Sequence, residues 1–154
     1  MAKTLRLLLV EDNADDALLI ARELRRSGLD PSLERVETAA QMLAALESGE
    51  WDAILCDHQL PDFSAPAALQ ILRKHGKDIP FIIVSGEIAE EMAAAAMRAG
   101  ARDYVSKGNL TRLAPAIERE LAEARLRRSQ RITDDAASDA LRTAERLASV
   151  GRMA

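Results

Sequence analysis

Short apolar runs alternate along this chain with longer stretches in which apolar residues recur every three or four positions. The apolar runs predict β-strands, and the longer stretches predict helices. The predicted strands cover 5–10, 32–36, 52–57, 79–85 and 102–106. The predicted helices run from 13 or 14 to Gly28, over 39–49, from 64 or 65 to 75, from 89 to 99, and from 109 or 110 onward. This alternation predicts an α/β domain in which right-handed crossovers build a parallel sheet with helices on both faces.

Four of the predicted strands lead directly into side chains that can carry chemistry. These are Glu11 and Asp12 after the first strand, Asp57 at the end of the third, Ser85 at the end of the fourth and Lys107 after the fifth. In an open α/β sheet, ligands bind just beyond the carboxyl ends of the strands. Three acids, a hydroxyl and a lysine at that edge predict a site for magnesium and a phosphoryl group.

Each of these residues also has an ordinary structural explanation when it is taken alone. Acids near a helix N-terminus stabilise the helix, so Glu11 and Asp12 are candidate caps of the first helix. Asp57 is likewise a candidate turn cap, and Lys107 a candidate solvated loop cation. The arrival of all of them at strand ends, in this order, favours one shared site over four separate explanations.

Composition narrows the class of protein. A chain of 154 residues with 48% hydrophobic content can bury one globular core. The net charge of -4 and the pI near 5.3 argue against a nucleic-acid-binding face. The sequence has no apolar stretch of the roughly 20 residues that a membrane span requires, so we expect no membrane contact. The first apolar run ends at two acids, not at a cleavage site, and the single cysteine, Cys56, fits a reducing compartment. We therefore expect a cytoplasmic location.

Four motifs, LLLVEDN, CDHQLPDF, IIVSGE and GARDYVSKG, occur in this order. Together they resemble a response-regulator receiver domain of bacterial phosphorelays. The resemblance covers about Thr4 to Arg127, so we expect a receiver domain over 1–127. It implies a doubly wound, flavodoxin-like parallel sheet of five strands in the order 2-1-3-4-5. That order sets the first and third strands side by side, which would bring Glu11, Asp12 and Asp57 together.

The resemblance also implies a role for each residue of the acidic group. Asp57 would be the nucleophile that takes a phosphoryl group from a phosphohistidine and becomes an aspartyl phosphate. Asp12 and Asp57 would bind Mg²⁺ directly, Glu11 would act through water, and the backbone carbonyl of Gln59 would complete the protein ligands. Lys107 would pair with Asp57 and later with a phosphate oxygen.

Two further residues of the family pattern would report the phosphorylation state. The Ser85 hydroxyl would donate to a phosphate oxygen, and Tyr104 stands where the family keeps an aromatic switch whose ring turns inward. The chain departs from the family at Gly108, where a cis proline is usual, and at Ala65, where a glycine is usual. Because a cis bond before a non-proline residue costs roughly 2.5–4 kcal/mol, we expect a trans bond and a differently shaped loop at Gly108.

The C-terminal segment 128–154 predicts a helical linker or the start of a dimerisation helix. The polar stretch 127–135 is either helical or interrupted at Thr133-Asp134. The phrase ALRTAERLASVGRMA resembles the segment just before the phosphorylated-histidine box of sensor histidine kinases. We therefore expect the N-terminal receiver of a hybrid kinase, cut before that histidine and without kinase motifs of its own. Its expected partners are a histidine kinase or phosphotransfer protein and a second copy, joined through a seam at Leu141, Ala144 and Ala148.

Two other kinds of protein stay open at this point. One is a pseudo-receiver, which uses the fold only as an interaction module, or a free-standing regulator. The intact acids and lysine argue against a pseudo-receiver, and the kinase-like tail argues against a free-standing regulator. The other is a magnesium-dependent phosphohydrolase with an aspartyl nucleophile. Such an enzyme needs a second acid beside the nucleophile, and His58 and Gln59 occupy those places here.

Overall fold

The computed structural model describes residues 4–58, 60–61, 63–86 and 90–153, with side chains described through 143 except those of 90, 135, 138 and 139. The strands are β1 (Thr4–Val10), β2 (Asp30–Val36), β3 (Ala53–Cys56), β4 (Phe81–Ser85) and β5 (Asp103–Ser106). The helices are α1 (Ala14–Arg26), α2 (Ala39–Ser48), α3 (Ala65–His75), α4 (Glu90–Ala99) and α5 (Leu113–Met153), with a 3-10 helix, η1 (Lys107–Arg112), before α5.

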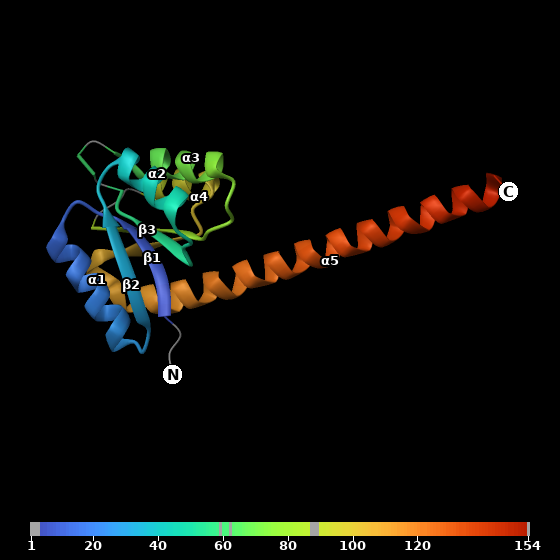
Figure 1. Cartoon of the computed structure of the whole chain (residues 1–154). Helices are drawn as coiled ribbons and strands as arrows, with labels where there is room; N and C mark the ends of the chain where they lie inside the picture. Colours follow the sequence, from blue (N-terminus) through green and yellow to red (C-terminus); the bar gives the residue numbers. More distant parts are fainter. Residues whose placement is uncertain (1–3, 59, 62, 87–89, 154) are drawn as a thin grey trace. The chain divides into compact units, whose positions relative to one another are not determined.

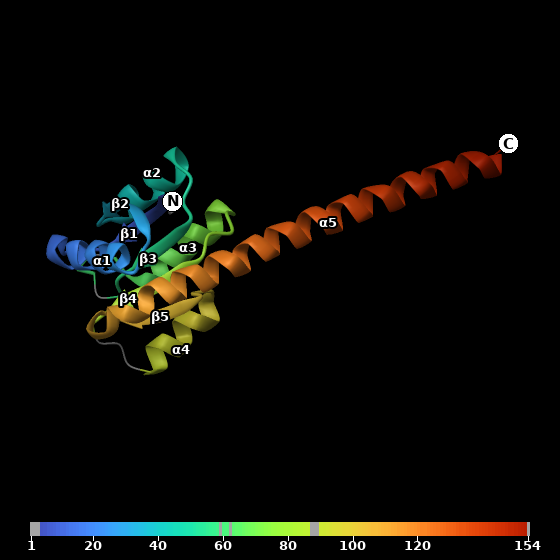
Figure 2. The same cartoon turned by 90° about the horizontal axis from the view of Figure 1, so that it is seen from below.

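The five strands form one parallel sheet in the order β2-β1-β3-β4-β5 (Figure 1, with β4 and β5 labelled in Figure 2). This order and the flanking helices confirm the predicted fold class. β2 begins at Asp30, two residues earlier than predicted. The extra residues include Pro31, whose missing N–H donor is tolerated because β2 lies at the edge of the sheet.

Both faces of the sheet are covered, which explains why the central strands are continuous apolar runs. Leu8 and Val10 pack into a core with α2 and α3, and Leu7 and Leu9 pack into a second core with α1 and the first turns of α5. Figure 1 and Figure 2 show α1 and α2 on opposite sides of the strands. β1 and β3 are therefore held from both sides, and the residues that follow them start from fixed positions.

The helix starts show which residues satisfy the free backbone N–H groups. The Asn13 side chain accepts from the backbone N–H groups of Asp15 and Asp16 and caps α1. Thr38 and Gln41 form a reciprocal capping box at α2. Because Asn13 is the cap of α1, Glu11 and Asp12 are not needed there.

The segment after β5 differs from the prediction. Residues Lys107–Arg112 form η1, and the α-helix begins at Leu113 instead of 109 or 110. Pro115 gives the physical reason, because proline has no N–H and its ring clashes with the carbonyl four residues earlier, so it fits only in a first helical turn. α5 then continues through Thr133 and Asp134 to Met153, which agrees with the helical alternative for this stretch.

Contacts between residues divide the chain into two compact units, Met1–Leu121 and Ala122–Ala154. The first unit holds the whole sheet and the strand ends that carry the predicted site residues. Across the part of the chain that is described, no helix has the length and apolar character needed to cross a membrane.

Candidate functional site

Strand pairing places the predicted acids next to one another. Val10 of β1 lies opposite Cys56 of β3, and the Asp57 N–H donates to the Val10 carbonyl over 2.9 Å. Glu11 is therefore the first residue after β1, and Asp57 is the first residue after β3. Both lie at the same edge of the sheet. On the other side of β3, Ser85 ends β4 and lies opposite Ser106 of β5, the residue before Lys107.

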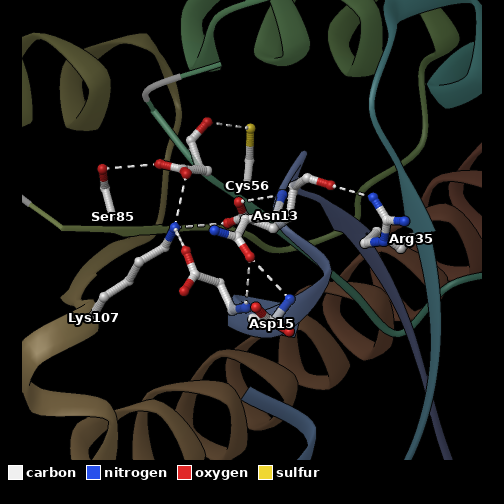
Figure 3. Close-up of polar contacts among 9 residues, drawn as sticks. Asn13, Asp15, Arg35, Cys56, Ser85 and Lys107 are labelled. Carbon is white, nitrogen blue, oxygen red and sulfur yellow. Dashed lines mark hydrogen bonds and ion pairs between the residues drawn. The ribbon is translucent and has the colours of Figure 1, made fainter. Parts of the chain in front are cut away.

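The side chains of these residues meet in one polar cluster (Figure 3). The Lys107 Nζ lies 2.8 Å from Asp57 Oδ2 and 2.9 Å from Glu11 Oε2. The Ser85 hydroxyl donates to the other carboxylate oxygen, Asp57 Oδ1, over 3.0 Å. Asp57 thus has a cation on one oxygen and a hydroxyl on the other, which fixes the plane of its carboxylate.

Burial gives the cluster unusual electrostatics. Glu11 is 1% exposed and Asp57 is 4% exposed. Burial raises the pKa of Glu11 to about 7, although hydrogen bonds from Lys107 and the Asn13 backbone oppose the rise. Burial alone would lower the pKa of Lys107, but its hydrogen bonds to Asp16, Asp57 and Glu11 outweigh this and raise the pKa above its usual value. Lys107 therefore remains a cation among acids that repel one another.

The acids of the cluster can hold a divalent cation. Glu11, Asp12 and Asp57 each offer a carboxylate oxygen, and these oxygens lie within 4.8 Å of one another. An all-oxygen donor set in a partly buried cluster of acids suits Mg²⁺, which prefers hard oxygen ligands and keeps several waters. Gln59, whose backbone carbonyl the family resemblance adds to this set, lies outside the described residues.

Tyr104 and the residues around Lys107 show how the neighbouring strand supports the site. Tyr104 is half-buried and packs against the core on the α2–α3 side of the sheet. The Ser106 hydroxyl accepts from the Gly108 N–H over 3.2 Å and so starts η1. The described peptide bonds include no cis bond, and the expected trans bond at Gly108 agrees with this.

Cys56 has a structural role beside Asp57. Its thiol is fully buried in the core and donates to the Asp57 carbonyl over 3.2 Å. Burial raises the pKa of this thiol, and the charges of Asp57 and Glu11 add to the rise. A thiol held protonated in this way is a small packing residue.

Sequence reasoning did not single out Asp16, which the structure adds to the cluster. Its Oδ2 lies 2.7 Å from Lys107 Nζ, which is shorter than the contacts of that ammonium group with Asp57 and Glu11. A sequence signal existed, because Asp16 lies in the first turn of a helix that starts at the functional edge of the sheet. Acids are common in first helical turns for other reasons, so the signal is weak alone.

Comparisons with known proteins agree with the geometry of the site. The family model described as "Response regulator receiver domain" matches residues 7–118. The chain is 30% identical over 130 residues to the DNA-binding transcriptional regulator NtrC of Rhizobium meliloti, covering 84% of this chain and 26% of that protein. It is 31% identical over 99 residues to the luminescence regulatory protein LuxO of Vibrio campbellii, covering 64% and 21%. The chain thus spans about a quarter of the length of these relatives.

Solved structures show the same fold. A response regulator from Hahella chejuensis is 30% identical, with a TM-score of 0.61, and the match covers 77% of this chain and 91% of that one. The receiver domain of a sensor histidine kinase from Pseudomonas aeruginosa, solved with a magnesium ion coordinated in its active site cleft, is 25% identical with a TM-score of 0.62. That match covers 78% of this chain and 99% of the other. With a family match over 7–118 and the same fold, the chain belongs to the response regulator receiver domains, the phosphoryl-acceptor modules of two-component systems.

Proposed function

We propose that this chain is the receiver of a phosphorelay and takes a phosphoryl group from a phosphohistidine onto Asp57. The observation that carries the proposal is the arrangement around that carboxylate. Lys107 contacts Asp57 Oδ2 and Ser85 contacts Asp57 Oδ1, so a cation and a hydroxyl donor already surround the oxygens that would attack phosphorus. The donor would be a histidine kinase or a phosphotransfer protein.

In the proposed transfer, one Asp57 oxygen attacks phosphorus and forms a P–O bond while the P–N bond to the donor imidazole breaks. The electron pair of the broken bond stays on the imidazole nitrogen. If the donor ring was protonated before transfer, the leaving imidazole is neutral; if it was not, the leaving ring takes a proton from solvent. A carboxylate approaching a phosphoryl group meets charge repulsion, so catalysis depends on positioned cations. Lys107 supplies one of these, and the Ser85 hydroxyl is placed to donate to an oxygen of the transferred group.

Magnesium fits the remaining residues of the site. Glu11, Asp12 and Asp57 would hold it, with the Gln59 carbonyl as the further ligand that the family resemblance implies. When bound, the ion supplies positive charge that offsets the acids and the incoming phosphoryl oxygens. The protein contributes the fixed spacing of the carboxylates, because two of them directly follow paired central strands.

The side chains of Ser85 and Tyr104 would both move on phosphorylation. In this structure the Ser85 hydroxyl is engaged with Asp57. After phosphorylation of Asp57, a phosphoryl oxygen would accept the hydrogen bond from Ser85 and draw the hydroxyl toward the new group. Tyr104, which is half-buried in β5, would then turn inward. This is a population shift between two packings, driven by the new hydrogen bond.

The C-terminal helix supports a proposal about the parent protein. α5 runs without interruption to Met153, and Leu126, Ile132 and Leu141 on it are exposed by 63%, 71% and 62%. Exposed leucine and isoleucine on a long polar helix favour association with another helix. We therefore place this chain before the dimerisation helices of a cytoplasmic hybrid histidine kinase, without contact to nucleic acid, and expect a homodimer joined through this helix.

Phosphoryl uptake tests the main proposal directly. With acetyl phosphate and Mg²⁺, the intact mass of the chain should rise by one phosphoryl group, and chelation of the metal should prevent the gain. A pseudo-receiver would show no gain under either condition. A phosphohydrolase would release phosphate through many turnovers without accumulating the modified chain.

Light scattering tests the proposed dimer. Residues 1–154 should have the mass of a dimer at high micromolar concentration, and a chain ending at Leu126 should be monomeric, because it lacks Ile132 and the Leu141 seam. The truncation keeps Leu121 and Ala124, which are buried, so the receiver core stays intact. Two monomers in this comparison would show that association requires further helices of a longer protein.

A further inference from the structure

The Asp16 carboxylate, which contacts the Lys107 ammonium, has no part in the proposed transfer. Within the part of the chain that the structure describes, the Lys107 ammonium contacts Glu11, Asp57 and Asp16, and the Asp16 contact is 2.7 Å long. Asp16 comes from the first turn of α1, 91 residues away in sequence. It is not a member of the acid group whose oxygens converge for a metal ion, which consists of Glu11, Asp12 and Asp57.

The three contacts will not all persist through phosphoryl transfer. An ammonium group has three N–H donors, and here Lys107 donates hydrogen bonds to Asp16 and Asp57 and forms an ion pair with Glu11. Glu11 and Asp57 are the acids that a metal ion and a phosphoryl group would engage, so their oxygens are drawn into other interactions as the reaction proceeds. Asp16 stands outside that set and can keep its contact throughout.

We infer that Asp16 is a positioning residue that holds the Lys107 ammonium beside the acceptor oxygen of Asp57 during phosphoryl transfer. The inference rests on the proposed function, since it assigns Asp16 a part in the same reaction. Asp16 does not touch the reacting atoms; it acts through Lys107.

The local structure suits this role. The Asp16 N–H donates to the Asn13 side chain over 3.2 Å, so the capped first turn of α1 fixes the backbone from which the carboxylate projects. Lys107 is a long, flexible side chain at the start of η1. Its side chain is 20% exposed and that of Asp16 is 30% exposed, so water partly screens the pair without separating it. A fixed acid on a rigid helix therefore restricts a mobile cation, which is the general way that a supporting residue lowers a reaction barrier.

Two other roles for Asp16 would lead to different experimental results. If Asp16 only stabilises the N-terminus of α1, then Asp15, the adjacent acid in the same first turn, should matter equally. The ion pairs found among the described residues do not include one between Asp15 and Lys107, and Figure 3 shows Asp15 beside its cap, Asn13. If Asp16 draws Lys107 away from the nucleophile, its removal should accelerate phosphorylation.

The test compares initial rates of phosphorylation over a range of acetyl phosphate concentrations at saturating Mg²⁺. The proteins are the full chain and its Asp16→Ala, Asp16→Asn and Asp15→Ala variants, with the modified fraction read by intact mass. We expect Asp16→Ala to lower the limiting rate about tenfold with a half-saturating concentration within about twofold of the starting protein. Asp16→Asn keeps an oxygen acceptor and should recover most of the rate, and Asp15→Ala should match the unaltered chain.

Any of three outcomes would overturn the inference: a limiting rate for Asp16→Ala that equals or exceeds that of the unaltered chain, an equal loss in Asp15→Ala, or a loss confined to the half-saturating concentration. Failure of the unaltered chain to take up phosphoryl would instead overturn the proposed function.

A second measurement does not depend on phosphoryl transfer. Acetic anhydride should modify Lys107 several-fold faster in Asp16→Ala than in Asp15→Ala, with Lys77 in the same molecule as the internal reference. Equal labelling of Lys107 in the two variants would show that Asp16 does not hold the ammonium group.

Discussion

Replacement of Asp57 by asparagine is expected to reduce phosphoryl uptake from one group per chain to none. An amide oxygen is a poor nucleophile and cannot form the acyl phosphate, whereas the size and shape of the side chain are unchanged. Lys107 keeps Glu11 and Asp16 as partners, so the cation should remain in the site. The measurement is the intact mass after incubation with acetyl phosphate and Mg²⁺, with circular dichroism to show that the fold is retained.

Asp52→Asn provides a matched control for that experiment. Asp52 precedes β3, and Asp57 follows the same strand, so the two acids stand at opposite ends of one element. The Asp52 carboxylate accepts from the Arg6 N–H over 2.8 Å and has no part in the polar cluster. The control should take up one full phosphoryl group. A full equivalent on Asp57→Asn would show that another residue is the acceptor.

Much of the fold and the core of the site follow from the sequence because both depend on local patterns. The run Leu7–Val10 is apolar at every position, as a strand covered on both faces requires, and its short length favours a strand over a buried helix. Once the strands are known to be parallel, the polar residues that follow them must share an edge. Glu11, Asp57 and Lys107 could thus be placed at one edge, and the strand order that the family resemblance implies set Glu11 beside Asp57.

The parts that sequence reasoning missed depend on tertiary geometry or on competing local signals. The contact between Asp16 and Lys107 requires a particular placement of α1 against η1, and no short-range pattern records this. β2 begins two residues before its predicted start and includes Pro31, which an edge strand tolerates. Residues 107–112 contain one apolar residue, Leu110, so their pattern does not distinguish a 3-10 helix from an α-helix, and Pro115 fixes where α5 begins.

Asp12 provides the prediction with the clearest thermodynamic signature. Three carboxylates whose oxygens lie within 4.8 Å repel one another, and a divalent cation bound to the folded chain relieves that repulsion. Because the unfolded chain does not assemble the site, Mg²⁺ should raise the free energy of unfolding by about 2.7 kcal/mol at 100 times its dissociation constant. Urea unfolding with excess Mg²⁺ and with a chelator measures this gain.

In the Asp12→Ala variant, the gain from Mg²⁺ should fall to a small fraction of its original value, since one of the three converging oxygens is lost. Asp12 is exposed and is not the cap of α1, so the substitution leaves the helix start intact. Without metal, the variant should be at least as stable as the original chain, because one repelling charge is gone. Asp15→Ala, which removes an equal charge from the nearby first turn of α1, should keep the full response to Mg²⁺. An equal gain in Asp12→Ala and the original chain would show that Asp12 is not a ligand, and the metal would then have to rest on Glu11 and Asp57.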